Sequence, residues 1–427
     1  MIGRFDGGSP SSGFTPNGIV TRENGSIVVF GSYDDPVSAG AITLAVPSQS
    51  DAFLFTVDPT GVPISAENYG GRGKVGSPLI AVNGESTIIA GAYRDSAEFE
   101  GVAFTNSSTR SAAFWLKLDA KRTPVWGNHA YSLTTTGLVS IDSIICENDV
   151  VSVGGHFVSS AQIGSFVVSN RGRDDGFVCR INQSGDVEWI RLVAGPDVDV
   201  VEHIAPAPEG GVYVAGRFSV EAEVLGVFIR ASQFSEVFVA RLDSAGRTLW
   251  VQHGPASGTR GVTSDSDGNP YVLVRVPQGF AGIDSTFTNV VAKYSADGDL
   301  WWTRSIRASV GDNRGDIQGF AIPSIDSVAV ATYSNLGLGF TNLASTSGAI
   351  VGKFSPDPPK VAVSVNDRRE IAISWPEWAY RYHLESSPTI SPDQVWAPYS
   401  AIISNIGTIF LATPTNADPR QFFRLVR

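Results

Sequence analysis

The chain has 427 residues, 42% of them hydrophobic, which is enough to bury a large core. Its net charge of −11 makes phosphate backbones and anionic membranes poor partners, and fits divalent cations or neutral glycans better. No apolar stretch approaches the roughly 18 residues of a membrane span, and residues 1–6 lack the basic and apolar segments of a signal peptide. We therefore expect a globular protein that binds no nucleic acid and has no membrane span.

Two motifs recur along the chain at intervals of about sixty residues. The first is Phe-x-x-x-hydrophobic-Asp (or Asn), with copies at residues 53–58, 114–119, 177–182 and 238–243 and weaker copies at 290–295 and 350–355. The second is a small residue, any residue and an aromatic residue, at 31–33, 91–93, 155–157, 216–218 and 331–333, with a degenerate copy at 274–276. A period of this size indicates one supersecondary unit copied in series.

The segment 200–254 shows the content of one unit. Runs of β-forming residues at 200–206, 212–218, 238–242 and 248–253 predict four strands, and 219–235 forms an elaborated connection. The turns after the first and third strands contain the Asp, Asn and Gly residues of tight hairpins. We expect no helix of three turns before residue 357.

Four antiparallel strands per unit, repeated around an axis, describe a β-propeller. First strands begin near residues 18, 78, 139, 200, 261 and 318, and the last unit lacks a fourth strand, because a Pro-rich segment at 356–359 ends the pattern. Residues 1–6 fit the third-strand pattern, so we predict that they pair with 350–354 and close a six-bladed ring. The alternatives are a seven-bladed ring whose missing part and signal peptide lie upstream, and an open solenoid with unprotected end blades.

The units resemble the bacterial β-propeller repeats called SBBP. The resemblance rests on Phe-Val-Ala-Arg-Leu-Asp-Ser-Ala-Gly-Arg-Thr-Leu-Trp at 238–250 and Gly-Gly-Val-Tyr-Val-Ala-Gly-Arg-Phe at 210–218. It covers residues 1–357 and is weak near 260–290. It implies a secreted or surface-attached propeller, and it transfers no active site, because the family carries no agreed catalytic motif.

Residues 358–427 form a second predicted domain after a stiff proline-rich linker, where the sixty-residue period is lost. Alternating runs at 361–365, 370–375, 380–385, 396–401, 408–412 and 421–426 predict a small β-sandwich. Ile-Ser-Trp-Pro at 373–376 and Arg-Gln-Phe-Phe-Arg-Leu at 420–425 are similar to a short fibronectin-III-like module. That resemblance implies export rather than a reaction.

The only two cysteines, Cys146 and Cys179, fall on the first and third strands of one unit. Those strands are not neighbours in the predicted sheet, so we expect no disulfide and two small buried hydrophobic side chains.

Tryptophans recur on the predicted fourth strands, at Trp126, Trp189, Trp250, Trp301 and Trp302. They could be platforms for sugars or the docking tryptophans of a quinone-dependent propeller. A repeat copies its core positions first, however, so we favour packing between blades. The five histidines lack the spacing of a metal site, and we expect structural roles for them. They are His129, His156, His203, His253 and His383.

Five loop motifs have a weak resemblance to known sites. Asp265-Ser266-Asp267-Gly268-Asn269 resembles the start of a calcium loop but lacks the distant glutamate, so a hairpin turn is the better interpretation. Even weaker calcium candidates lie at 33–35 and 311–313, and 314–316 spells Arg-Gly-Asp, a match that is common by chance. The segment 70–76 superficially resembles a phosphate loop, but no Ser or Thr follows Lys74 and a strand is predicted next.

No nucleophile elbow and no cysteine–histidine signature is present, so we assign no catalytic, cofactor-binding or metal-binding residue and predict no cofactor. A carboxylate pair for glycoside hydrolysis stays open, because such pairs assemble in space.

Three functions follow. The favoured one is a non-catalytic extracellular or cell-surface binding or adhesion scaffold that holds a glycan or protein on a propeller face. The second is a polysaccharide-acting enzyme, which needs two or more carboxylates and a His or Arg to converge at the propeller mouth from non-equivalent positions. The third is a structural surface protein with a featureless central face. The sequence does not determine the ligand, the face used or the oligomeric state.

Overall fold

The computed structural model describes residues 5–7, 15–47, 49–70, 74–99, 101–277, 287–306, 317–324, 327–334, 348–354, 362–365, 371–376, 382–388, 396–399, 402–406, 409–413 and 422–426. Within these ranges the chain forms β-strands and one short 3-10 turn, Pro208–Gly210. The predicted all-β fold is therefore confirmed. None of the described segments is a helix long and apolar enough to cross a membrane.

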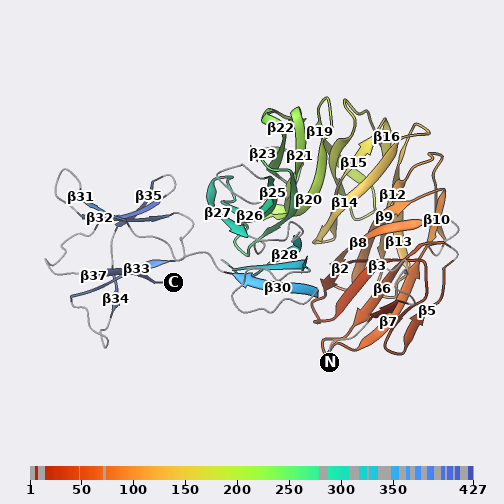
Figure 1. Cartoon of the computed structure of the whole chain (residues 1–427), viewed down its shortest axis with the longest axis horizontal. Helices are drawn as coiled ribbons and strands as arrows, with labels where there is room; N and C mark the ends of the chain where they lie inside the picture. The colour runs from red at the N-terminus through yellow and green to blue at the C-terminus, as the bar shows by residue number, and fades with distance from the viewer. Residues whose placement is uncertain are drawn as a thin grey trace.

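Antiparallel four-stranded sheets, whose strands follow each other in chain order, form the repeat units (Figure 1). Blade 1 consists of β2 (Thr15–Thr21), β3 (Ile27–Tyr33), β6 (Asp51–Val57) and β7 (Pro63–Tyr69). Blade 2 consists of β8 (Val75–Asn83), β9 (Ser86–Tyr93), β12 (Ala112–Leu118) and β13 (Pro124–Ser132). Blade 3 consists of β14 (Leu138–Glu147), β15 (Val150–Val158), β18 (Asp175–Ile181) and β19 (Val187–Ala194).

The later sheets keep this order. Blade 4 consists of β20 (Val200–Ala207), β21 (Gly211–Val224), β22 (Val227–Leu242) and β23 (Thr248–Gly254). Blade 5 consists of β24 (Gly258–Ser264), β25 (Pro270–Pro277), β26 (Phe287–Tyr294) and β27 (Leu300–Ile306). A further sheet contains β28 (Ile317–Ser324), β29 (Ser327–Ser334) and β30 (Gly348–Phe354). Strands are found where the sixty-residue pattern predicts them.

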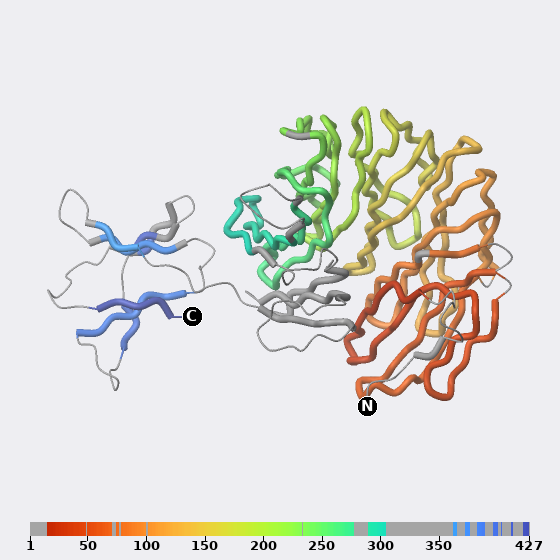
Figure 2. The backbone as a smooth tube through the Cα atoms, viewed as in Figure 1, coloured from red at the N-terminus to blue at the C-terminus, as the bar shows by residue number. Residues whose placement is uncertain are grey.

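The first strands of successive blades contact one another. β8 contacts both β2 and β14, and β20 contacts both β14 and β24. Figure 2 shows the sheets following each other along an arc in chain order. Sheets radiating from a row of adjacent first strands make a β-propeller, as the repeat predicted.

A hairpin between the second and third strands of each of blades 1–4 reaches outward. The hairpins are β4 (Val37–Ala39) with β5 (Ile42–Leu44), β10 (Ser96–Phe99) with β11 (Val102–Thr105), β16 (Ala161–Ile163) with β17 (Phe166–Val168), and the tip of β21 and β22. Each pairs with the fourth strand of the preceding blade where that strand is described. Gly70 after β7 bridges to Glu98, Ala130 pairs with Ile163, and Val193 pairs with Val224.

The N-terminal strand β1 (Phe5–Gly7) makes a pairing that the sequence pattern did not predict. It pairs with β4 of blade 1 (Phe5 with Ala39 and Gly7 with Val37), and no pairing with β30 is found among the described residues. Residues 1–4 lie outside the described residues. The pairing with β4 repeats the one between β13 and β16, so β1 occupies the place of a fourth strand in front of blade 1.

Tryptophans of the fourth strands lie between blades, as predicted. The indole Nε1 of Trp126, Trp189 and Trp250 donates to a carbonyl in the third-to-fourth turn of the next blade. The acceptors are Gln183 (2.9 Å), Ser244 (3.1 Å) and Ala296 (2.8 Å). We call this contact the Trp–turn clamp.

The turn in each clamp carries a glycine in the left-handed region. Gly185, Gly246 and Gly298 have φ of 88°, 74° and 97°, and a Cβ there would lie 2.8, 2.7 and 2.8 Å from the nearest indole atom. The side chain two residues beyond each tryptophan donates to the carbonyl of the same glycine. Those donors are Asn128, Arg191 and Gln252.

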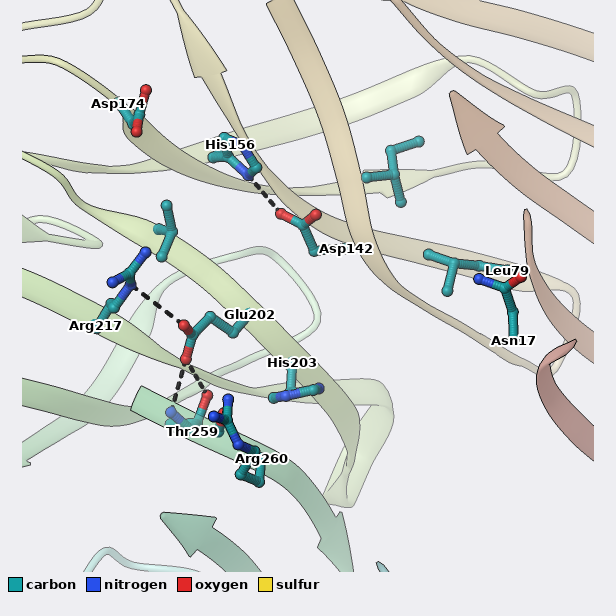
Figure 3. Close-up of a pocket in the computed structure, with 12 residues that line it drawn as sticks. Asn17, Leu79, Asp142, His156, Asp174, Glu202, His203, Arg217, Thr259 and Arg260 are labelled. Carbon is teal, nitrogen blue, oxygen red and sulfur yellow. Dashed lines mark hydrogen bonds and ion pairs between the residues drawn. The ribbon is translucent and has the colours of Figure 1, made fainter. Parts of the chain in front are cut away.

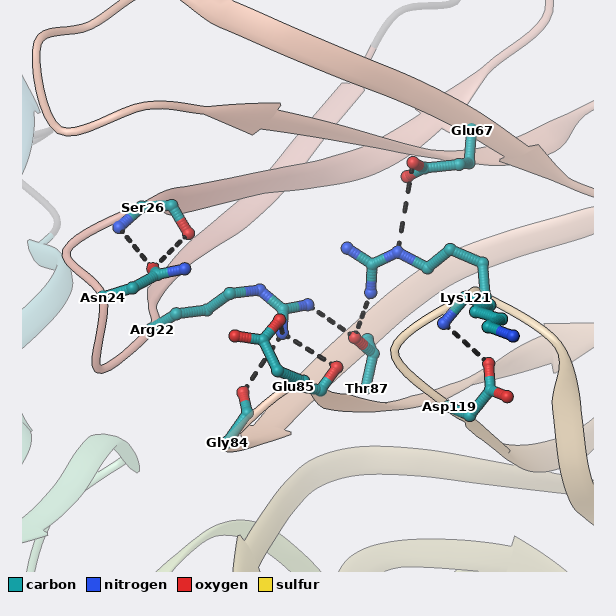
Figure 4. A network of polar contacts seen from close by, with 10 residues as sticks. Arg22, Asn24, Ser26, Glu67, Gly84, Glu85, Thr87, Asp119 and Lys121 are labelled. Atoms are coloured by element: carbon teal, nitrogen blue, oxygen red, sulfur yellow. Dashed lines mark hydrogen bonds and ion pairs between the residues drawn. The ribbon is translucent and has the colours of Figure 1, made fainter.

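A polar network joins blades 1 and 2 (Figure 4). The buried guanidinium of Arg22 donates to the carbonyls of Gly84 (3.2 Å) and Glu85 (3.0 Å) and to Thr87 Oγ1 (2.7 Å). Arg122 also donates to Thr87 Oγ1. Like the clamps, this network links one blade to the next partly through turn backbone, here blade 1 to blade 2.

Cys146 and Cys179 are unpaired, as predicted. They lie on β14 and β18, with β15 between them in the sheet. Burial raises the pKa of both thiols, that of Cys146 to about 11. Both therefore stay as neutral thiols at physiological pH.

The C-terminal segment contains two antiparallel sheets. The first has the order β31 (Ala362–Val365), β32 (Ile371–Pro376), β36 (Ile409–Thr413) and β35 (Ile402–Ile406). The second has the order β34 (Ala397–Pro398), β33 (His383–Ser387) and β37 (Phe422–Val426). Ile373, Trp375 and Ala412 of one sheet and Leu384 of the other form one buried cluster. The six predicted runs are strands, and β35 is an additional one that the sequence pattern did not indicate.

Replacing Gly246 by alanine should destabilise the propeller by more than the same change at Gly226. Both glycines have positive φ (74° and 89°), but a Cβ at Gly246 meets the Trp189 ring at 2.7 Å, whereas at Gly226 nothing lies within 4 Å. We expect Gly226→Ala to cost about 1 kcal/mol and Gly246→Ala about 1–3 kcal/mol more in free energy of unfolding. Thermal and urea unfolding measure the difference, and equal losses would contradict the clamp.

Candidate functional site

The first strands of several blades bulge at the same place. The ladder to the second strand skips one residue in blades 1, 3, 4 and 5. The skipped residues are Asn17, Asp142, Glu202 and Arg260. In blade 2 the skip spans residues 77–78. A β-bulge redirects a side chain out of the regular alternation, so each of these strands presents a residue that the hydrophobic pattern does not include.

The glycine of the repeat motif is explained by the bulge. In blades 1, 3 and 4 the residue opposite the bulge is Gly31, Gly155 or Gly216. A Cβ at these positions would lie 2.0–2.1 Å from a first-strand carbonyl oxygen. The motif therefore preserves the close approach of two backbones. Its variable middle residue lies opposite the residue two positions before the bulge residue.

The bulge residues line one cavity of about 420 Å³ (Figure 3). Its lining comes from the first strands of blades 1–5, from two second strands and from the segment before β18. The polar members are Asn17, Asp142, His156, Asp174, Glu202, His203, Arg217, Thr259 and Arg260. We call this cavity the channel pocket, since it is bounded by the adjacent first strands.

Asp142 orients His156 within blade 3. Asp142 Oδ2 lies 2.6 Å from His156 Nδ1, and Oδ1 accepts from Ser140 Oγ at 2.9 Å. Burial alone would lower the pKa of His156, but the hydrogen bond and charge of Asp142 outweigh it and raise the pKa above its usual value. His156 Nε2 makes no hydrogen bond to the described residues, so this nitrogen is available to a ligand.

Glu202 forms an ion pair with Arg217 within blade 4. Glu202 Oε2 accepts from Thr259 N at 2.7 Å and Thr259 Oγ1 at 2.6 Å, and Oε1 lies 3.3 Å from Arg217 Nε. The bulge carboxylate thus pairs with a basic side chain of the second strand, as Asp142 does with His156, but through an ion pair rather than a hydrogen bond.

His203 differs from His156. Burial lowers its pKa, and the positive charge of Arg260 acts in the same direction, whereas Glu202 opposes the shift. A neutral imidazole and a protonatable one therefore line the same pocket.

Two buried carboxyls lie beside the pocket, Asp175 at the start of β18 and Asp199 just before β20. Asp175 and Asp199 are both fully buried. Asp175 Oδ2 accepts from Arg171 N at 2.6 Å, and Asp199 Oδ1 accepts from Ser219 N at 3.0 Å. Burial raises the pKa of both carboxyls, that of Asp199 to about 7.

The sequence candidates outside this pocket have other roles. His129 contacts the Tyr93 hydroxyl at 2.7 Å, and His253 contacts Glu236 at 2.6 Å. The register places both histidines opposite the repeat phenylalanine, as their similar positions predicted. His383 lies 3.5 Å from Glu385.

The calcium-like turn at 265–269 is braced by hydrogen bonds and an ion pair of Asp265. Asp265 Oδ1 accepts from Asp267 N and Asn269 N, and Oδ2 lies 3.1 Å from the fully buried Lys293 Nζ. Within the described part of the chain, no three His, Cys, Asp or Glu side chains are grouped to hold a metal. A strand, β8, follows the phosphate-loop-like segment, as predicted. Residues 311–313 and 314–316 lie outside the described residues.

Sequence reasoning assigned no residue to this site. His156 and His203 were interpreted as structural, and Asp142 and Glu202 were not singled out. The available signal was a charged residue at the same place in an otherwise apolar first strand of successive repeats.

Comparison with known proteins leaves the family open. No family model and no curated protein matches the chain. Among solved structures, the chain is similar to hydrazine synthase of Kuenenia stuttgartiensis at 12% identity and a TM-score of 0.43, covering 74% of this chain and 75% of that one. It is similar to the Dos1 propeller at 11% identity and a TM-score of 0.42, covering 74% of each chain. YCF48 bound to D1 peptide matches at 11% identity and a TM-score of 0.37, over 98% of this chain and 97% of that one.

The pKa values of the two pocket histidines should be shifted in opposite directions from the usual value. We expect an imidazole pKa above 6.5 for His156 and below 6.5 for His203 in an NMR titration. Asp142→Asn removes the negative charge that raises the His156 pKa, so that pKa should fall. An unchanged His156 titration in Asp142→Asn would contradict the assigned pair.

Asp199 should make the protein less stable at higher pH. Its folded pKa of about 7 lies above the unfolded value of about 3.9, so its contribution is fully present below about pH 4 and is lost as pH rises through 7. Between pH 4 and pH 8, the free energy of unfolding of Asp199→Asn should rise by on the order of 3 kcal/mol relative to that of wild type. Exposed Asp186→Asn is the control for denaturant unfolding at both pH values, and parallel curves for all three proteins would refute the shift.

Proposed function

We propose that the protein is a non-catalytic binding scaffold that holds a glycan in the channel pocket. The observation that supports this most directly is the shared bulge. Successive repeats project a different polar side chain from the same backbone position into one cavity. A purely structural repeat would have no need for different charged groups there, which argues against a featureless spacer.

The chemistry of the lining suits a hydroxyl-rich ligand. Both acidic and basic side chains line the cavity, so it offers donors and acceptors, and sugar hydroxyl groups use both. Among the described residues, the two imidazoles are the only aromatic rings of the lining, so recognition there would depend on hydrogen bonds rather than on stacking. The chain's net charge of −11 disfavours polyanionic nucleic acid as the ligand.

An enzyme acting on polysaccharide is the second candidate. Three carboxylates, two histidines and two arginines do meet at the pocket, and His156 Nε2 is open to a substrate. Asp142 and Glu202 are both engaged by basic or hydroxyl donors, however, whereas glycoside hydrolysis needs one carboxyl held protonated as an acid. Binding without turnover therefore fits the geometry better.

We extend the proposal to the whole chain. The place of β1 as a fourth strand before blade 1 supports a six-bladed ring in which β28, β29 and β30 are completed by the N-terminal segment. The SBBP-like repeats and the fibronectin-III-like C-terminal module support an extracellular or cell-surface location and a glycan or surface protein as partner.

Blocking the pocket should abolish glycan binding. Asn17 lines the cavity and is exposed, so Asn17→Trp fills it without removing a hydrogen bond found in the structure. Ile19, on the same strand but outside the pocket, is 65% exposed and provides the control Ile19→Trp. In a glycan array followed by calorimetry, we expect wild type and Ile19→Trp to bind the same glycan. Asn17→Trp should bind it about tenfold or more weakly, a loss of about 1.4 kcal/mol or more in binding free energy.

Three outcomes would contradict the proposal. A wild-type protein that binds no glycan argues against the function. Binding that Asn17→Trp leaves unchanged places the site elsewhere. Turnover of a bound polysaccharide, detected as new reducing ends or shortened chains, makes the protein an enzyme.

A further inference from the structure

We infer that the glycan is an acidic one, and that the pocket holds the carboxylate of a uronic acid between Arg217 and His156. This inference rests on the proposed glycan-binding function and adds the ligand class. The argument uses the position, the orientation and the charge of these two side chains.

Arg217 and His156 occupy the same place in adjoining blades. Each is the variable middle residue of the repeat motif, on the second strand of its blade. Each pairs with the residue two positions before the bulge, Arg217 with Val200 and His156 with Ser140. Equivalent backbone positions in neighbouring blades lie at the same level of the channel, and both side chains line the same cavity.

Arg217 is held by an ion pair at Nε, and its other guanidinium donors are open. Its Nε lies 3.3 Å from Glu202, and that carboxylate is fixed in turn by two donors from Thr259. The two terminal nitrogens of Arg217 make no hydrogen bond to the described residues, and the side chain is 41% exposed. Parallel donors on a planar guanidinium match the two oxygens of a carboxylate, which an ammonium group does not.

His156 supplies a second donor. Asp142 holds its Nδ1, which leaves Nε2 directed away from that contact (Figure 3). The same contact favours the protonated ring, so Nε2 carries a hydrogen and the imidazole a positive charge over a wider pH range. A carboxylate then receives charge-assisted hydrogen bonds from two adjoining blades.

The other groups around the cavity select a singly charged ligand. Asp174 lines the pocket and makes no side-chain hydrogen bond or ion pair within the described part of the chain. Its carboxylate can accept a sugar hydroxyl, and it repels a more highly charged group such as a phosphate or sulfate dianion. A uronic acid offers one carboxylate with hydroxyl groups on the neighbouring carbons, which is the combination that this lining complements.

The test compares one oligosaccharide in two charge states. Oligogalacturonate and its methyl ester have the same backbone, and the ester lacks the negative charges. In titration calorimetry at neutral pH, we expect the affinity of wild type for the acid to exceed its affinity for the ester by about tenfold or more. Added salt should weaken the binding of the acid and leave the binding of the ester unchanged.

Three variants locate the contact. Arg217→Gln should lower the affinity for the acid about tenfold to hundredfold and change the affinity for the ester little. Arg217→Lys, which keeps the charge but not the planar fork, should lose less. Arg230→Gln is the matched control, because Arg230 also pairs with a glutamate, Glu221, at 2.6 Å, but on the outer hairpin of blade 4. His156→Gln should weaken the acid and flatten the pH dependence of its binding.

Thermal unfolding of each variant separates a lost contact from a lost fold. Equal affinity of wild type for acid and ester, or binding of neutral glycans alone, would overturn the inference and leave the proposed function standing. A loss of the same size in folded Arg217→Gln and Arg230→Gln would also overturn it. If neither these probes nor any glycan of the array binds, the inference and the proposed function fail together.

Discussion

The contact between a fourth-strand indole and the turn of the next blade is the constraint on which the rest of this propeller depends. Each of Trp126, Trp189 and Trp250 covers a left-handed glycine and donates to a carbonyl of the following blade. A buried indole contributes apolar area, and its N–H must have an acceptor, so the contact is both large and directional. Repeating it sets the distance and the angle between successive sheets.

The channel pocket follows from that spacing. Because the same contact recurs between successive blades, residues at one repeat position meet in one part of the channel. In blades 1, 3, 4 and 5 the bulge turns a single residue of the first strand toward this space, and the carboxylates at two bulges pair with basic residues of the second strands. The buried carboxyls of Asp175 and Asp199 lie beside it and link the charge of this region to pH.

The sequence predicts the scaffold much better than the site, and the reason is physical. A sixty-residue period, alternating runs and turn residues report on strands and cores, so the sheets, the unpaired cysteines and the interblade tryptophans were predictable. The bulge leaves only a weak mark in the hydrophobic pattern, a single polar residue within a first strand, and that mark does not reveal which way the side chain points. Asp142 and His156 are fourteen positions apart, and only their register on β14 and β15 brings them together.

The N-terminal strand shows a related limit. Residues 1–6 match a third strand in composition, and composition cannot state which open edge a strand will join. The hairpin β4–β5 offers such an edge, and the structure pairs β1 with it. The hairpins also had only a weak signal, since short apolar runs within an elaborated connection do not reveal their partner in the preceding blade.

The bulge also separates two requirements that usually conflict during evolution. The clamps and the opposing glycines maintain the shape of the repeat, whereas the residue on the bulge faces the cavity and takes no part in the clamps. A substitution at one of these positions, together with its second-strand neighbour, would change the chemistry of the channel and leave the Trp–turn clamps in place. A gene encoding such repeats can therefore acquire a new ligand preference through very few mutations.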